Sequence, residues 1–438
     1  MSRIGCIDLL DAGLSGVAGA QHIIGLISSR RRVTKLILGS NDLGDAGSVV
    51  LFRFLSSAIG RKYQVEIISL NANHIGNRGL SAISEYLAGS YSLKQLFLQN
   101  NQFSNDPSLF AKFAKAVNSS HLELLALTSN WSLADSFMDV FIRQLEAPHL
   151  LELHLSAIGL TATSGPLLVE FISSSSCNLH TLKCSGNSLG LRAVRALVRA
   201  VERSNFALTS LELYSNSSAA NPPASSDNTE DDEDEECWNP GSDAWKANDA
   251  YIRRVLARNS HLKRVIEKDA LCLLRCARPL LLTRSAAPAG SPQCEDCSCA
   301  TSSRTPVETI SPTSGRGTFP FLFLPTELQL DILALLAPSL SSAQRVRIYD
   351  YAASPSTLPP ARTALCVPGF QVKGASLCVL DPATTMAFGV GGGGCSGGKC
   401  AGGGGKSVLC HKEQQRAEWL KAVGCATYDP NRGDWTGF

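Results

Sequence analysis

A short segment recurs through the first half of this chain, and its regular spacing constrains the fold more than any other feature. Each copy has apolar residues at its first, fourth and sixth positions and, in most copies, asparagine at its ninth. Successive sixth positions are separated by 29, 32, 28, 29, 28, 29 and 29 residues. Such a period is very hard to obtain by chance and indicates units that stack on their neighbours. These marker positions are Leu9, Leu38, Leu70, Leu98, Leu127, Leu155, Cys184 and Leu213.

Each unit carries the pattern of a strand followed by a helix. The alternating apolar residues predict a short strand whose apolar side chains point into the interior. Residues 43–55 and 189–201 then have apolar residues three and four apart, which predicts a helix after the turn. The result is an α/β solenoid with parallel strands inside and helices outside. It resembles the ribonuclease-inhibitor-like class of leucine-rich repeats, and this resemblance implies a horseshoe.

The asparagine of each unit should hydrogen-bond main-chain groups of the neighbouring coil, since strand pairing does not satisfy them at the turn. Ala12 and Ile158 replace it in two units, where we expect weaker hydrogen bonding between coils. It is present as Asn41, Asn73, Asn101, Asn130, Asn187 and Asn216.

The repeat region is expected to extend over residues 1–284. We predict a ninth unit at 261–267 (HLKRVIE), with a helix over 244–259 before it and a capping helix over 267–284 after it. Residues 217–243 form an insert, and the eight carboxylates between 227 and 236 predict that it is disordered. It is either a solvated spacer or a docking patch for a basic partner, which phosphorylation of Thr229 would strengthen.

The strand position just before each marker should lie on the concave face, where solenoids usually bind partners. Lys183 and Glu212 stand on neighbouring strands and are expected to pair with each other. The pattern does not bring a nucleophile, a base and an orienting acid together, so we expect a protein-binding surface and no enzyme. The predicted contact residues are Ile37, Ser69, Phe97, His154, Lys183 and Glu212, with Tyr214 as a further aromatic contact.

Composition narrows the class of protein. A formal net charge of +2 offers no basic face for nucleic acid. We expect no membrane segment, because no window has about 18 uninterrupted apolar residues. Only three of the 15 cysteines precede residue 237, so we expect a reducing compartment, the cytoplasm or the nucleus, rather than a disulfide framework.

A Ser-, Thr- and Pro-rich stretch, residues 285–318, predicts a disordered linker before a helical segment at 319–354. There Leu324-Pro325 is followed by Leu328 and Ile332 on a short amphipathic helix. This resembles the opening helix of the F-box, and the resemblance implies that these four residues bind the Skp adaptor of cullin ubiquitin ligases. The alternative is an apolar helix that packs on the rest of the chain.

Residues 355–438 form a small, irregular, Gly- and Cys-rich region. Its Gly405-Lys406-Ser407 lacks the first glycine of a phosphate-binding loop, since Cys400 occupies that position. Two readings remain open: a zinc site, or an appendage with buried or free thiols. The candidate zinc ligands are Cys395, Cys400, Cys410, His411 and Cys425.

Two functions therefore follow from the sequence. The first is a non-enzymatic scaffold that holds a protein partner, with the substrate receptor of a cullin ubiquitin ligase as its specific form. The second is a regulator of a small GTPase, because the repeats at 33–55 and 93–117 resemble those of Ran GTPase-activating protein. That resemblance implies an arginine in an early loop, for which Arg61 and Arg78 are the candidates.

Overall fold

The computed structural model describes residues 5–216, 242–285, 321–357 and 411–430. They fall into two compact units, Met1–His261 and Leu262–Phe438. Each unit has its own cluster of buried apolar residues.

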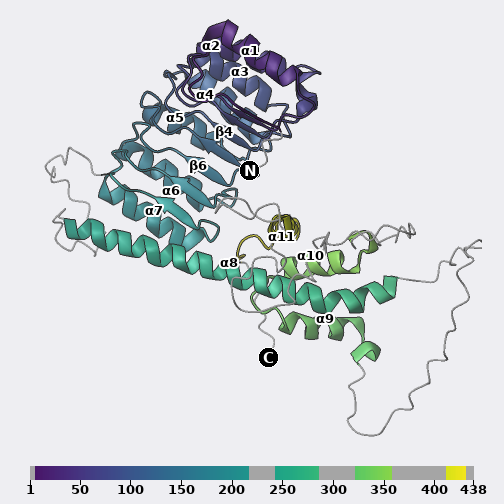
Figure 1. Ribbon diagram of the computed structural model, residues 1–438. Coiled ribbons are helices and arrows are strands. Elements are labelled where there is room, and N and C mark those ends of the chain that lie inside the picture. The colour runs from purple at the N-terminus through teal and green to yellow at the C-terminus, as the bar shows by residue number, and fades with distance from the viewer. Residues whose placement is uncertain (1–4, 217–241, 286–320, 358–410, 431–438) are drawn as a thin grey trace, which may run out of the picture. The chain divides into compact units, whose positions relative to one another are not determined.

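Eight short strands within residues 5–216 form one parallel sheet, in which each strand pairs with the next one along the chain (Figure 1). Every pairing has the same register, so equivalent residues of successive units lie side by side. This confirms the predicted parallel strands. The strands are β1 (Cys6–Asp8), β2 (Lys35–Ile37), β3 (Ile67–Ser69), β4 (Gln95–Phe97), β5 (Leu124–Ala126), β6 (Glu152–His154), β7 (Thr181–Lys183) and β8 (Ser210–Glu212).

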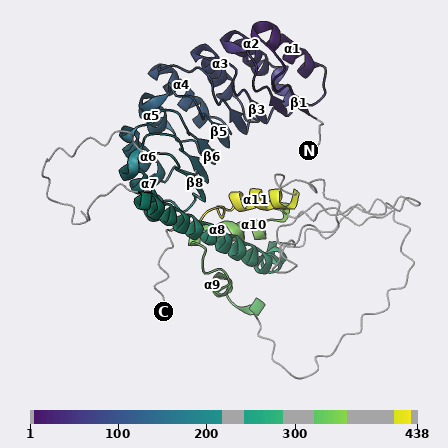
Figure 2. The same cartoon turned by 60° about the vertical axis from the view of Figure 1, so that its left-hand side comes forward.

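A helix follows each of the first seven strands, and these helices succeed one another along one side of the first unit (Figure 2). The repeated alternation of strand and helix fits a repeat solenoid. The helices are α1 (Gly16–Ser28), α2 (Gly44–Ser56), α3 (Asn77–Leu87), α4 (Pro107–Asn118), α5 (Ala134–Phe141), α6 (Gly165–Ser173) and α7 (Gly190–Ser204), with the 3₁₀ turns η1 (Gly60–Tyr63), η2 (Ile142–Gln144) and η3 (Ala162–Ser164).

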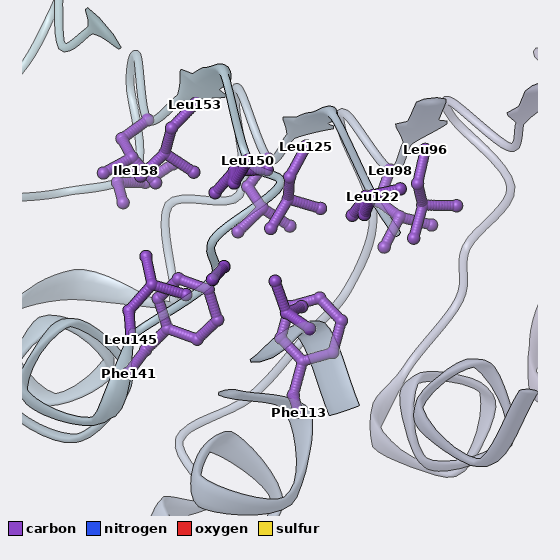
Figure 3. Packing of buried hydrophobic residues seen from close by; sticks show 14 of the residues in the cluster. Leu96, Leu98, Phe113, Leu122, Leu125, Phe141, Leu145, Leu150, Leu153 and Ile158 are labelled. Carbon is purple, nitrogen blue, oxygen red and sulfur yellow. The ribbon is translucent and has the colours of Figure 1, made fainter. Parts of the chain in front are cut away.

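The core of the first unit lies between the strands and the helices. Middle strand residues such as Leu96 and Leu125 are fully buried and point toward the helices (Figure 3). Phe113 of α4 and Phe141 of α5 stack there with ring centroids 5.5 Å apart. Burying one such side chain contributes about 1.5–3 kcal/mol. Because the apolar side chains of one repeat are covered by those of the next, a repeat contributes this stability only when its neighbours are folded beside it.

The predicted asparagine ladder is present: five of the six asparagines are buried and Asn101 is half-buried. Asn187 Nδ2 donates to the carbonyls of Leu155 and Cys184 at 2.9 and 3.0 Å. Its Oδ1 accepts from the backbone N–H groups of Ile158, Gly159 and Leu160 at 3.1–3.2 Å. The coil that has Ile158 in place of asparagine is therefore hydrogen-bonded by Asn187 of the following coil. Ile158 itself has no side-chain amide that could donate to the preceding coil or accept from it.

The predicted ninth unit at 261–267 is wrong. Residues 261–267 lie inside one helix, α8 (Ser242–Ser285), which also contains the two helices predicted on either side. Leu262, Val265 and Ile266 have helical spacing, and the helix continues through Asn259, where the predicted helix over 244–259 ends. The buried Asn259 amide donates to the carbonyls of Asn205 and Leu208 at 3.0 and 2.7 Å, in the manner of the ladder asparagines.

The cap of the last repeat is also placed differently from the prediction. Ile252 and Val255 of α8 join the first core, and Arg258 donates to the carbonyls of Val201 and Glu202 at 3.2 and 2.6 Å. The cap therefore lies before residue 261. The predicted capping segment, 267–284, belongs to the second unit, where Leu273 and other α8 residues are buried in a separate core.

The second unit combines segments that the sequence interpretation had treated as separate. Its core joins residues of α8 with Leu333 of α9 (Thr326–Leu335), Ile348 of α10 (Ser342–Ala353) and Trp419 of α11 (His411–Ala422). The turns η4 (Phe321–Phe323) and η5 (Pro355–Thr357) flank the first two of these helices. Residues 319–354 and the end of the 355–438 region thus share one core.

Three sequence expectations concern residues outside the described part of the chain: nearly all of the insert at 217–243, most of the linker at 285–318, and most of the Gly-rich stretch before α11. Among the helices that the structure does describe, none combines the length and apolar character needed to cross a membrane.

Candidate functional site

The parallel register brings the predicted contact residues into one row across the sheet. The third residue of each strand is aligned with the third residue of the next, from Asp8 of β1 to Glu212 of β8. Because side chains alternate along a strand, these residues lie on the face opposite the buried middle residues. We call this set the sheet row: Asp8, Ile37, Ser69, Phe97, Ala126, His154, Lys183 and Glu212.

The sheet row has an apolar part over β2 to β5. Ile37 and Phe97 are half-buried there. The first residues of neighbouring strands, Ile67 and Leu124, are also half-buried and lie on the same face. The sequence interpretation did not include Ile67 and Leu124, although the period of two along each strand would have found them.

The other part of the sheet row, over β6 to β8, is charged. Lys183 Nζ lies 2.9 Å from Glu212 Oε1, which confirms that these neighbours pair. His154 Nε2 lies 3.6 Å from Glu152 Oε2, and the imidazole lowers the pKa of the Glu152 carboxyl despite its partial burial. The charges largely balance, so this end can orient a polar partner but does not select one sign of charge. Tyr214, two residues beyond Glu212, is 61% exposed.

The F-box-like residues of the second unit lie at the start of α9. Pro325 is the N-cap of this helix, and the buried Gln329 side chain donates to the carbonyls of Phe321 and Leu324 at 3.0 and 2.9 Å. These bonds hold the Leu324-Pro325 turn against the first turn of the helix.

One face of α9 is apolar and exposed. Leu328 is 49% and Ile332 is 39% exposed, whereas Leu333, about 100° further around the helix than Ile332, is buried in the core. Leu335 and Leu336 continue the exposed face at 66% and 44%. We call Leu328, Ile332, Leu335 and Leu336 the α9 face. A helix that served only to pack within this unit would not need four exposed large apolar residues on consecutive turns.

The candidate zinc ligands are only partly described. Cys395, Cys400 and Cys410 lie outside the described residues, and His411 is the first residue of α11. Cys425 is fully buried in the second core, and burial raises the pKa of its thiol to about 12. Among the described residues, no three His, Cys, Asp or Glu side chains group in a way that could hold a metal. The zinc site stays a prediction.

The two early-loop arginines differ in their surroundings. Arg61 in η1 donates from Nε to the carbonyl of Ser56 at 3.0 Å and from Nη1 to the carbonyl of Gly89. Arg78 is exposed on the first turn of α3. Arg61 thus links two successive coils, while Arg78 is accessible to a partner.

No family model matches the chain. Tonsoku-like protein of Mus musculus is 29% identical over 210 residues, which cover 46% of this chain and 15% of that protein. Rho GTPase-activating protein gacW of Dictyostelium discoideum is 26% identical over 154 residues, which cover 33% of this chain and 14% of that protein. The chain therefore spans only a small part of each relative's length.

Proposed function

We propose that this chain is a non-enzymatic scaffold of the cytoplasm or nucleus, in which a horseshoe-shaped leucine-rich repeat solenoid holds a protein partner on the sheet row. The apolar part around Phe97 supplies buried contact area, and the charged part around Lys183 fixes the orientation of the partner. The six described cysteines are free, in keeping with a reducing compartment.

The specific form of the proposal is a substrate receptor of a cullin ubiquitin ligase, with the α9 face bound to the Skp adaptor. The carrying observation is the exposure of Leu328 and Ile332, the two helical residues of the F-box-like motif. Apolar residues one turn apart on a helix can enter a groove of a partner as successive anchors.

Affinity capture from a eukaryotic lysate tests this assignment. The tagged full chain is compared with a Leu328→Asp, Ile332→Asp variant and probed for the Skp adaptor and cullin. Val346→Asp is the matched control, because Val346 is an exposed apolar residue of the same unit, 54% exposed on α10.

We expect the wild-type chain and Val346→Asp to capture adaptor and cullin, and the α9 variant to lose both. Circular dichroism should be unchanged in all three proteins, since the altered residues are exposed. Absence of adaptor from the wild-type capture would overturn the ligase assignment, while the proposal that a partner binds on the sheet row would stand.

A second candidate is a regulator of a Ran-like or Rho-like GTPase, which the name of the gacW relative favours. Arg78 is the better placed of the two candidate arginines, because it is exposed while Arg61 is bonded to neighbouring backbone. The test is the rate of GTP hydrolysis by Ran and Rho with the full chain added. An acceleration that Arg78→Ala abolishes and Arg53→Ala, an exposed helical control, leaves intact would favour this candidate.

A further inference from the structure

Helix α7 carries a charge pattern that no other described helix of the repeats shares. It has four arginines and a single carboxylate, Glu202, whereas each of α1 to α6 contains at most two Asp, Glu, Lys or Arg residues. Packing of the repeat does not require these arginines, because the other helices pack without an equivalent.

Three of the arginines form one exposed line. Arg192, Arg199 and Arg203 are exposed and lie within about 40° of one another around the helix, at 100° per residue. They lie opposite Val194 and Val201, which are buried in the core. From the first to the third, the line is about 16 Å long at 1.5 Å per residue. We call these three residues the arginine stripe.

The carboxylate on α7 does not neutralise the stripe. Glu202 is engaged by α8, where the Tyr251 hydroxyl donates to it and Arg254 lies 3.6 Å away. Across the described ranges, no carboxylate lies within ion-pair distance of Arg192, Arg199 or Arg203. Three exposed cations on one side of the helix therefore form a local positive field on a chain whose net charge is only +2.

We propose that the acidic run of this same chain, residues 227–236, docks on the arginine stripe. The run carries eight carboxylates in ten residues, and arginine binds carboxylates through two parallel hydrogen bonds. The seven consecutive acidic residues 230–236 can reach over about 20 Å, which is enough to cover the length of the stripe. The occupant and its site are complementary in charge and in length.

The covalent connection places the run within reach of the stripe. The run is followed by α8, which begins six residues after Glu236. Six residues can span about 20 Å. Tyr251, nine residues into α8 and so about 14 Å along it, already contacts Glu202 of α7. Such a short tether gives an effective concentration on the order of millimolar, so even weak ion pairs can keep the run bound.

Docking would give the insert a defined role within the first unit. The bound run would shield the stripe from acidic segments of other proteins. Phosphorylation of Thr229, which is followed directly by acidic residues, would add negative charge to the docked segment and tighten it. This inference does not depend on the F-box assignment, because it involves neither the α9 face nor the sheet row.

Zero-length cross-linking of the full chain tests the proposal. Arg192→Lys, Arg199→Lys and Arg203→Lys keep the charge of the stripe and supply amines that a triazine coupling reagent (DMTMM) joins directly to carboxylates. Arg53→Lys, an exposed position of α2, is the matched control. Lys246, whose Nζ lies 3.0 Å from Asp243, shows that the reagent has reacted.

We expect mass spectrometry to find links from positions 192, 199 and 203 to residues 227–236, at least about fivefold more abundant than links from position 53. About 0.5 M sodium chloride, where the Debye length is about 4 Å, should remove most of them. Equal yields at the stripe and at position 53, or no links at the stripe, would overturn the proposal. So would links that form only between chains, which mixing isotope-labelled with unlabelled protein detects.

Discussion

Replacing Asn187 by alanine gives a direct measure of how much the asparagine ladder stabilises the repeats. The side chain makes five hydrogen bonds of 2.9–3.2 Å to backbone groups of two coils. A buried hydrogen bond contributes about 1 kcal/mol net, so the loss sums to about 3–5 kcal/mol. The effect should be large because the preceding coil has Ile158 at its own ladder position and depends on Asn187 for three backbone N–H groups.

Hydrogen exchange of the peptide spanning residues 156–161 is the most direct assay, since it reports the local opening of that coil. A loss of about 3 kcal/mol corresponds to exchange more than a hundredfold faster. Asn178→Ala is the control: this exposed asparagine makes one bond of 3.4 Å and should change stability by no more than about 0.5 kcal/mol. If Asn187→Ala lowers the free energy of opening by less than about 1 kcal/mol, water or a relaxed backbone hydrogen-bonds the freed N–H and C=O groups. The number of hydrogen bonds would then not predict the stability of the coil.

Three further predictions concern other parts of the first unit. Phe141→Ala should lower the free energy of unfolding by about 3–5 kcal/mol in urea titrations, because the ring is fully buried and stacked. Removing the half-exposed Lys183–Glu212 pair by Lys183→Ala and Glu212→Ala should change stability by less than about 1 kcal/mol, as a double-mutant cycle would measure, even if it weakens partner binding. Burial raises the pKa of Cys184 from 9.0 to about 12, so the thiol ionises in the unfolded chain at a lower pH than in the folded one, and the free energy of unfolding should fall as pH rises from about 9 toward 12. Cys184→Ala should make this fall less steep by up to about 1.4 kcal/mol per pH unit, as urea titrations at several pH values would measure.

The repeats could be predicted from the sequence because their causes are local and periodic. A strand must alternate its apolar residues, and the turn needs an amide that both donates and accepts, so Leu96 and Asn101 are recognisable without any tertiary contact. The sheet row follows from the same repeat, since equivalent residues of successive strands pair with each other even though the spacing varies from 28 to 32 residues. No single residue of the sheet row predicts that a partner binds there, because solenoids of this class bind unrelated partners.

The end of the repeats was misread because two patterns overlap there. The segment HLKRVIE satisfies part of the repeat template, yet Leu262, Val265 and Ile266 also satisfy the period of a helix. Only the buried position of Asn259 and the two separate cores along α8 show which pattern prevailed.

For this protein the sequence alone determined the strand–helix unit, its eightfold recurrence, the parallel register and the asparagine ladder. Three features were decided by the tertiary structure. It determines which part of α8 packs on the last repeat, which side of α9 is exposed, and that α11 contributes to the core that contains Ile348. The physical reason is the range of the interactions. A repeat is stabilised by neighbours about 29 residues away, whose pattern is visible in the chain, whereas the second core joins residues from 266 to 425 that share no period.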